Sequence, residues 1–193
     1  SLYLSENKLV RLPSKVFVGL DNLEILSLSH NMIEFIDKNA IEELKNLKEL
    51  YLSRNYIKNI DPGLFSGNPK IEKLVLSGNK LIMSEDPVLY SKSLNHLIMD
   101  NCNMFYITSQ LFTGLPNLVT INVADNSMMS IDHRTFLSHH SLKLLNLLNN
   151  DLDCDCEIKM LWKLLLNRGA ILKWVCEGWE VSHEQDESTI VDL

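Results

Sequence analysis

The chain has 193 residues, a mass of 22.2 kDa and a formal net charge of −7. This length suits one ordinary domain or a run of small repeats. Because 46% of the residues are hydrophobic, the chain can bury enough apolar surface to fold, and a disordered protein is excluded. No stretch approaches the roughly 18 uncharged apolar residues of a membrane-spanning helix. With 18 basic and 25 acidic residues, the sequence carries no basic footprint for nucleic acid.

A repeat of 24 residues dominates the chain up to about residue 152. Asn recurs at this spacing, with one step of 23 residues and with Cys once in place of Asn. Three apolar residues in the pattern LxxLxL precede the polar residue of each full copy, and another apolar residue follows two positions later. The recurring polar positions are Asn7, Asn31, Asn55, Asn79, Cys102, Asn126 and Asn150.

Each part of this repeat has a structural reason. Alternate side chains of the LxL segment point to the same face of a short strand, and each unit can bury its leucines only against neighbouring units. A buried amide offers both donors and an acceptor to the turning backbone. We therefore expect the polar positions to form a buried ladder, in which Cys102 is a structural and unpaired member.

The pattern LxxLxLxxNxL resembles the leucine-rich-repeat family, in the 24-residue form with a recurring Phe that is common in extracellular animal proteins. In this chain the recurring Phe includes Phe17, Phe65 and Phe112. The resemblance implies an α/β fold, a right-handed horseshoe-shaped solenoid with a parallel β-sheet of about seven strands on its concave face. It covers residues 1–152 as about seven repeats, of which the first is partial.

The segment 153–193 differs from the repeats and holds the other three cysteines, Cys154, Cys156 and Cys176. Apolar residues at helical spacing predict a helix over 157–167, which Gly169 ends. This segment resembles the C-terminal cysteine-rich cap that covers the open end of extracellular leucine-rich-repeat domains. Most of the net negative charge also lies here, since residues 151–193 hold 10 acidic and 4 basic residues. Such a run usually forms a solvated face, and a contact surface for a basic partner is the alternative.

The family's cap has four cysteines, paired first to third and second to fourth. The resemblance therefore implies a disulfide between Cys154 and Cys176, and a bond from Cys156 to a cysteine beyond Leu193. We accordingly expect a truncated cap and a chain that is a fragment of a longer protein. A zinc site that includes His183 is the rival interpretation, but C-x-C with one distant Cys lacks the usual spacing of zinc ligands.

Residues between and just after the strand leucines are predicted to line the concave face, because side chains alternate along a strand. The most varied of them cluster in repeats three to five, beside the 23-residue step. Aromatic, cationic and aliphatic groups together are typical of a binding hot spot, although unselected surface is mixed as well. The predicted ligand-binding residues are Tyr3, Glu49, Tyr51, Arg54, Lys73, Val75, His96, Ile98 and Asp100.

Enzyme signatures are missing from the sequence, which has no phosphate-binding glycine loop and no His-Glu-x-x-His. We therefore expect no catalytic residue, cofactor or metal, and we expect a protein ligand or partner subunit. By resemblance, the chain is the ectodomain of a receptor of Toll-like or of neuronal and adhesion type. The alternative is a secreted scaffold, such as an immune-recognition or matrix subunit in a heteromeric complex. Disulfides imply an oxidising compartment, and an intracellular scaffold with reduced cysteines is the third hypothesis.

Overall fold

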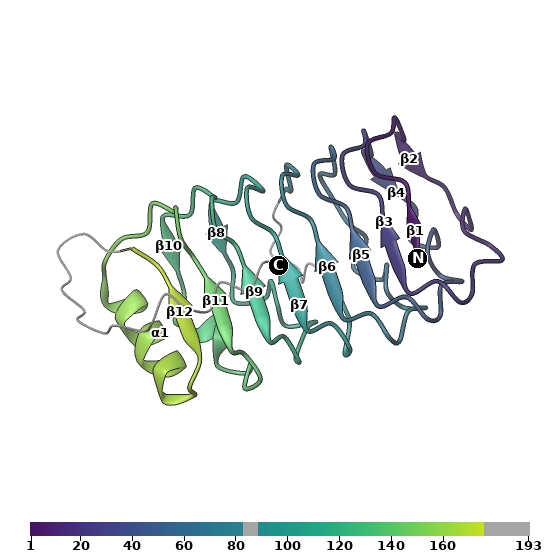
Figure 1. Ribbon diagram of the computed structural model, residues 1–193. Helices are drawn as coiled ribbons and strands as arrows, with labels where there is room; N and C mark the ends of the chain where they lie inside the picture. The colour runs from purple at the N-terminus through teal and green to yellow at the C-terminus, as the bar shows by residue number, and fades with distance from the viewer. Residues whose placement is uncertain (83–88, 176–193) are drawn as a thin grey trace.

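The computed structural model describes residues 1–82 and 89–175, which form an elongated solenoid (Figure 1). Strands from successive repeats pair in parallel and in register, so that Leu26 lies beside Leu50, and Leu50 beside Leu74. The expected parallel sheet of a repeat solenoid is confirmed. In spatial order its eight strands are β1 (Leu2–Tyr3), β3 (Ile25–Ser27), β5 (Glu49–Tyr51), β6 (Lys73–Val75), β7 (His96–Ile98), β9 (Thr120–Asn122), β11 (Leu144–Asn146) and β12 (Ile171–Lys173).

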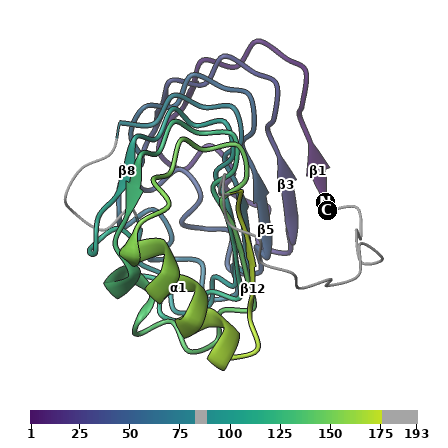
Figure 2. The ribbon, with the colours of Figure 1, turned by 90° about the vertical axis from the view of Figure 1, so that its left-hand side faces the viewer.

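The remainder of each repeat consists of turns and short strands that lie away from this sheet (Figure 2). Within the described residues the repeats contain no α-helix, so the expected α/β class is wrong for them and the fold is a β-solenoid. A 24-residue turn leaves only short segments between its bends, and Pro69 and Pro116 further disfavour a helix there. The short elements are β2 (Arg11–Leu12), β4 (Phe35–Ile36), β8 (Tyr106–Ile107), β10 (Ser130–Ile131) and the 3₁₀-helix η1 (His133–Phe136).

The leucines of the repeat form one continuous core. The middle residue of each three-residue strand in the repeats is buried, as Leu26, Leu50 and Leu74 illustrate. Full burial of one such side chain contributes about 1.5–3 kcal/mol. Because each repeat packs mainly against its two neighbours, these contributions add along the solenoid.

Buried asparagines tie each repeat to the one before it. The Asn55 Nδ2 group donates to the backbone oxygens of Leu52 (2.9 Å) and of Leu28 in the preceding repeat (3.1 Å). Its Oδ1 atom accepts the backbone N–H of Ile33 (2.9 Å). The same arrangement recurs at Asn31, Asn79, Asn126 and Asn150.

Asn7 and Cys102 depart from this arrangement. Asn7 is exposed and donates to carbonyls of its own turn. The Cys102 thiol donates to the backbone oxygen of Leu76 (3.3 Å), but sulfur is a weak acceptor. In other repeats the ladder Asn accepts a backbone N–H group from the preceding repeat, and the corresponding group here is the N–H of Leu81. The Leu81 N–H donates instead to the backbone oxygen of Cys102 (3.2 Å). The 23-residue repeat has therefore rearranged its hydrogen bonds around the thiol.

Cys102 and Cys156 are free cysteines within the described residues, and they should differ sharply in reactivity. Burial raises the pKa of the Cys102 thiol to about 12, whereas Cys156 is exposed. Because the thiolate is the reactive form, we expect Cys102 to be alkylated at least about a hundredfold more slowly than Cys156 in the native chain. Mass spectrometry after timed iodoacetamide treatment measures both rates. Equal rates without denaturant would contradict the buried position of Cys102.

Helix α1 (Cys156–Asn167) begins one residue before the predicted span and ends where expected. Its N-cap, Asp155, accepts the backbone N–H groups of Glu157 and Ile158. At the other end Gly169 has a φ of 64°, which glycine adopts without strain. The N–H groups of residues 169 and 170 donate to the carbonyls of residues 166 and 165, which is a Schellman end.

The helix covers the end of the core through the buried side chains of Ile158, Leu161 and Leu165. The Arg168 guanidinium group then donates to the carbonyls of Phe136 (2.8 Å) and Leu137 (2.8 Å), which lie at the end of η1. Beyond the helix, β12 pairs with β11 and continues the sheet. The sheet thus has an eighth strand where about seven were expected, because the chain returns to the sheet edge after α1.

The cysteine predictions reach beyond the described residues. Cys176 and His183 both lie outside them, so the disulfide between Cys154 and Cys176 stays a prediction, as does the boundary at residue 152. Cys156 carries an exposed free thiol. In the described part of the chain, no helix has the length and hydrophobicity needed to cross a membrane.

His139 is a buried histidine at a position where earlier repeats carry Leu44 and Leu115. Its ring packs edge-on against Phe112. The two ring nitrogens lie 3.2 Å from the carbonyl oxygens of Thr135 and Phe112. Burial outweighs these hydrogen bonds and lowers the pKa of His139 below its usual 6.5. The neutral imidazole is therefore the form that the folded state favours.

The stability of the chain should consequently fall in weak acid. The unfolded state binds a proton on His139 more readily than the folded state does. The stability that neutral His139 contributes is therefore lost as the pH falls from about 6.5 through the lower pKa of the folded state. We expect His139→Leu to reduce the loss of unfolding free energy between neutral and weakly acidic pH. Urea unfolding at both pH values measures it. The exposed His140 is the matched control, and an equal reduction in His140→Leu would contradict the assignment.

Candidate sheet-face binding site

The structure gathers most of the predicted ligand-binding residues on three adjacent strands. In each of these strands the central Leu is buried and the two residues that flank it are partly exposed. We call the surface that these flanking residues form the sheet face; Figure 1 shows the strands that carry it. One register row joins Glu49, Lys73 and His96, and the next joins Tyr51, Val75 and Ile98. All six side chains are half-buried. They form one surface because neighbouring strands lie about 4.8 Å apart.

Charged and aromatic groups on β5 and β6 contact one another. The Tyr51 hydroxyl donates to Glu49 Oε2, and the Lys73 ammonium lies 5.5 Å from the centre of the Tyr51 ring, within cation–π range. Burial, reinforced by the hydrogen bond to the negative Glu49, raises the pKa of Tyr51 to about 12. The phenol therefore stays protonated at physiological pH, and the three side chains hold each other in place.

His96 extends this cluster on β7. Burial, together with the nearby positive charge of Lys73, lowers the pKa of His96. The imidazole is thus neutral near pH 7 and can donate or accept a hydrogen bond. It presents this polar group next to the apolar surface of Ile98, on the same strand.

The residues that follow the strands add a second polar group. Asp100 accepts hydrogen bonds from the Ser77 hydroxyl (2.7 Å) and from the Asn122 amide (3.3 Å). Asn122 was not among the predicted residues, although it follows the aliphatic Val75 and Ile98 in its column. Arg54 is exposed and has a φ of 51°. It lies against Gly78, where a Cβ atom would be 3.1 Å from Arg54 Cγ.

Tyr3 is separated from this cluster. It lies on β1, and Ser27 of β3 stands between it and Tyr51 in the register. Its side chain is 69% exposed. The structure therefore unites the predicted residues of repeats three to five and leaves Tyr3 at the end of the sheet.

One group of potential metal ligands lies elsewhere, where η1 meets α1. Atoms of Asp132, His133 and Glu157 lie within 4.8 Å of one another. Glu157 Oε2 is 2.7 Å from His133 Nδ1, and this hydrogen bond lowers the pKa of Glu157. The Arg134 Nε–H group donates to both carboxylate oxygens of Asp132, and this contact lowers the pKa of Asp132. These side chains are already paired, so their contacts explain how α1 docks on η1.

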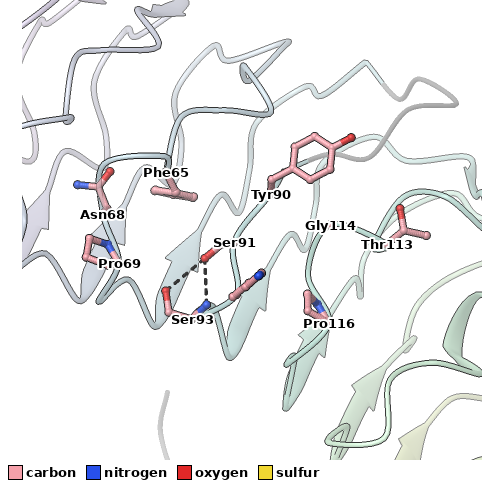
Figure 3. Close-up of a pocket in the computed structure, with 10 residues that line it drawn as sticks. Phe65, Asn68, Pro69, Tyr90, Ser91, Ser93, Thr113, Gly114 and Pro116 are labelled. Carbon is pink, nitrogen blue, oxygen red and sulfur yellow. Dashed lines mark hydrogen bonds between the residues drawn. The ribbon is translucent and has the colours of Figure 1, made fainter.

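A hollow of about 630 Å³ lies between the turns that precede β6, β7 and β9 (Figure 3). Its wall includes Phe65, Pro69, Tyr90 and Pro116. The hollow is next to the short repeat, in which five positions separate Leu89 from Leu94 where the other repeats have six. The sequence located this deletion but did not indicate the hollow beside it.

Comparison with known proteins supports the repeat assignment. A family described as leucine rich repeat matches residues 1–57 and 36–81. Residues 1–81 are therefore leucine-rich repeats. The repeats of about 24 residues continue past the matched segments in the structure, with the same ladder up to Asn150. Leucine-rich repeats typically serve as non-enzymatic binding modules. No curated protein matches the sequence.

Several solved structures resemble this chain. A chain from the octameric complex of Latrophilin 3, Unc5D and FLRT2, in which FLRT2 is the leucine-rich-repeat component, is 28% identical with a TM-score of 0.79. The match covers 93% of this chain and 55% of that chain, so this chain spans about half its length. The APL1 leucine-rich-repeat domain shares the fold at 24% identity and a TM-score of 0.64, and the match covers 76% of this chain and 38% of that one. Human 5T4 shares it at 23% identity and a TM-score of 0.70, and the match covers 91% of this chain and 70% of that one.

Proposed function

We propose that this chain is a non-enzymatic recognition module that binds a protein partner through the sheet face of repeats three to five. The observation that carries the proposal is the register of β5, β6 and β7, which places an aromatic, two aliphatic and several polar side chains on one continuous surface. Such mixtures dominate binding energy in protein interfaces. The contacts among Glu49, Tyr51 and Lys73 pre-order the surface, which reduces the entropy lost on binding.

The comparison with FLRT2 supports a protein partner. That leucine-rich-repeat protein occurs in a complex with Latrophilin 3 and Unc5D, so the same solenoid serves protein assembly there. We infer by analogy that the partner of this chain is also a protein, and its identity does not follow from the fold.

We further propose an extracellular setting, in which the chain is part of a receptor ectodomain. The cysteine-rich segment after residue 152 supports it, as does the name trophoblast glycoprotein of the structurally similar 5T4. A secreted scaffold or immune-recognition subunit would use the same surface. The two differ in what anchors the module, and a free-thiol count on non-reduced protein separates both from an intracellular scaffold.

A binding screen tests the proposed surface. The chain, displayed as a multimer, is offered to a panel of extracellular protein domains that includes Latrophilin 3 and Unc5D. The control is Val18→Asp, because Val18 lies on an exposed turn away from the sheet. We expect a partner that binds the native chain and this control equally well but binds Ile98→Asp at least about tenfold more weakly. A partner that binds all three chains equally would refute the sheet-face site.

A further inference from the structure

A second surface carries large exposed apolar side chains, away from the sheet face. It follows the ladder: the residues three positions after each ladder residue form what we call the edge column. In order these are Val10, Glu34, Lys58, Ile82, Phe105, Met129 and Asp153. Together with Tyr106, the three consecutive members Ile82, Phe105 and Met129 form what we call the apolar stripe. Their side chains are between 45% and 64% exposed.

Backbone hydrogen bonds place members of the edge column side by side. The N–H of Ile82 donates to the Lys58 carbonyl (2.8 Å), that of Met129 to Phe105 (3.4 Å) and that of Asp153 to Met129 (3.1 Å). Tyr106 begins β8, which pairs with β10 on the side of the solenoid away from the main sheet (Figure 2). The stripe is therefore a surface of its own, separate from the residues proposed to bind a partner.

The stripe is large enough to mark a contact. Four side chains that each expose about half of roughly 200 Å² supply about 400 Å², a size at which exposed apolar patches on soluble proteins are usually functional. Stable complexes bury about 800 Å² per partner. An interface centred on this stripe would therefore be weak and reversible.

The charges at the two ends of the stripe indicate which partner fits. Lys58 lies two repeats before Phe105 and Asp153 lies two repeats after it, and both are exposed. They stand four repeats apart, about 19 Å at strand spacing, which is too far for them to pair within one chain. A positive and a negative charge at equal distances from an apolar centre are complementary to the same surface turned by 180°.

We propose that the apolar stripe is the centre of a twofold-symmetric contact between two copies of this chain, which pack antiparallel along this edge. Phe105 lies on the symmetry axis, Ile82 packs against the partner's Met129, and Lys58 pairs with the partner's Asp153. The contact leaves the sheet face of both copies open, so that one assembly presents two binding surfaces.

Sedimentation velocity over a wide concentration range tests this dimer, with Cys156 alkylated beforehand so that its exposed thiol forms no disulfide between chains. We expect the native chain and Val18→Asp to dimerise reversibly, and Phe105→Asp to weaken the dimer at least about tenfold. A native chain that stays monomeric at every concentration overturns the proposal, even if another protein binds the stripe. So does a dimer that Phe105→Asp leaves intact.

Charge reversal supplies a sharper test. Lys58→Glu and Asp153→Lys each create two repulsive pairs in a symmetric dimer, and we expect each variant alone to associate several-fold more weakly than the native chain. When the two variant chains are mixed, both pairs across the contact become attractive, and association should return. Failure of the mixture, or of the doubly substituted chain, to recover native association would overturn the antiparallel arrangement.

Discussion

Replacing Asn126 with leucine is expected to lower the free energy of unfolding by about 3–6 kcal/mol, because each buried polar group left unpaired costs about 1–3 kcal/mol. Asn126 accepts the backbone N–H groups of both Cys102 and Met104, and it donates to the carbonyls of Met99 and Val123. Leucine fills a similar volume but can replace none of these bonds. Urea unfolding followed by circular dichroism measures the change.

The matched control is Asn7→Leu in the first, partial repeat. Asn7 is exposed. Within the described residues its side chain donates only to the carbonyls of Leu4 and Ser5, which belong to its own turn. Water can satisfy these groups, and we expect a loss below about 1 kcal/mol. Equal losses at the two positions would mean that the buried amides do not hold successive repeats together.

Replacing Gly114 with alanine is the second change with a large expected effect. A Cβ atom at this position would lie 2.0 Å from the backbone oxygen of Leu89 and 2.9 Å from Tyr90 Cδ1. Leu89 is fully buried, so its backbone cannot withdraw without disturbing the core. We expect a loss of about 3 kcal/mol or more in the free energy of unfolding, measured by urea unfolding.

Gly63→Ala is the matched control for this substitution. Its Cβ atom would meet only the Oδ1 atom of Asp61 within 4 Å, at 3.1 Å, and a side-chain end on an exposed turn can move. We expect a change below about 1 kcal/mol of either sign. If Gly114→Ala were equally mild, the close approach of consecutive turns at Leu89 would have to be wrong.

The sequence predicted the repeating part of the fold well, because one spacing fixes many residues at once. The positions of Leu26, Leu50 and Leu74 relative to the ladder were enough to place strands, core and register. The helix was predicted to within one residue, because apolar side chains recur at helical spacing and Gly169 is a strong end signal. These features depend on local pattern, which is what a sequence displays.

Features that depend on how repeats meet were not predictable in the same way. The chain returns to the sheet as β12 only because α1 turns it back, and three residues give no periodicity to read. In the described residues the turns opposite the sheet hold the 3₁₀-helix η1 but no α-helix, which corrects the α/β expectation for the repeats. On the sheet face, the register united Glu49, Lys73 and His96 as the pattern indicated, but the link from Asp100 to Asn122 required side-chain geometry.

The exposed residues of the edge column show a further limit. Phe105 and Met104 are neighbours and both apolar, yet Met104 is buried and Phe105 is more than half exposed. Hydrophobicity alone cannot separate such neighbours in an irregular turn. The stripe appears only when each position is compared with the same position of every other repeat and with its exposure.

Hydroxyl-radical footprinting of the chain bound to its partner is the most direct test of recognition through the sheet face. Oxidation of Tyr51 and His96 should fall several-fold on binding, while Tyr90, an exposed tyrosine on a turn away from the sheet, should be oxidised as in the unbound chain. Protection of Tyr90 with unchanged oxidation of Tyr51 and His96 would contradict the proposed site and place the partner on the opposite side of the solenoid.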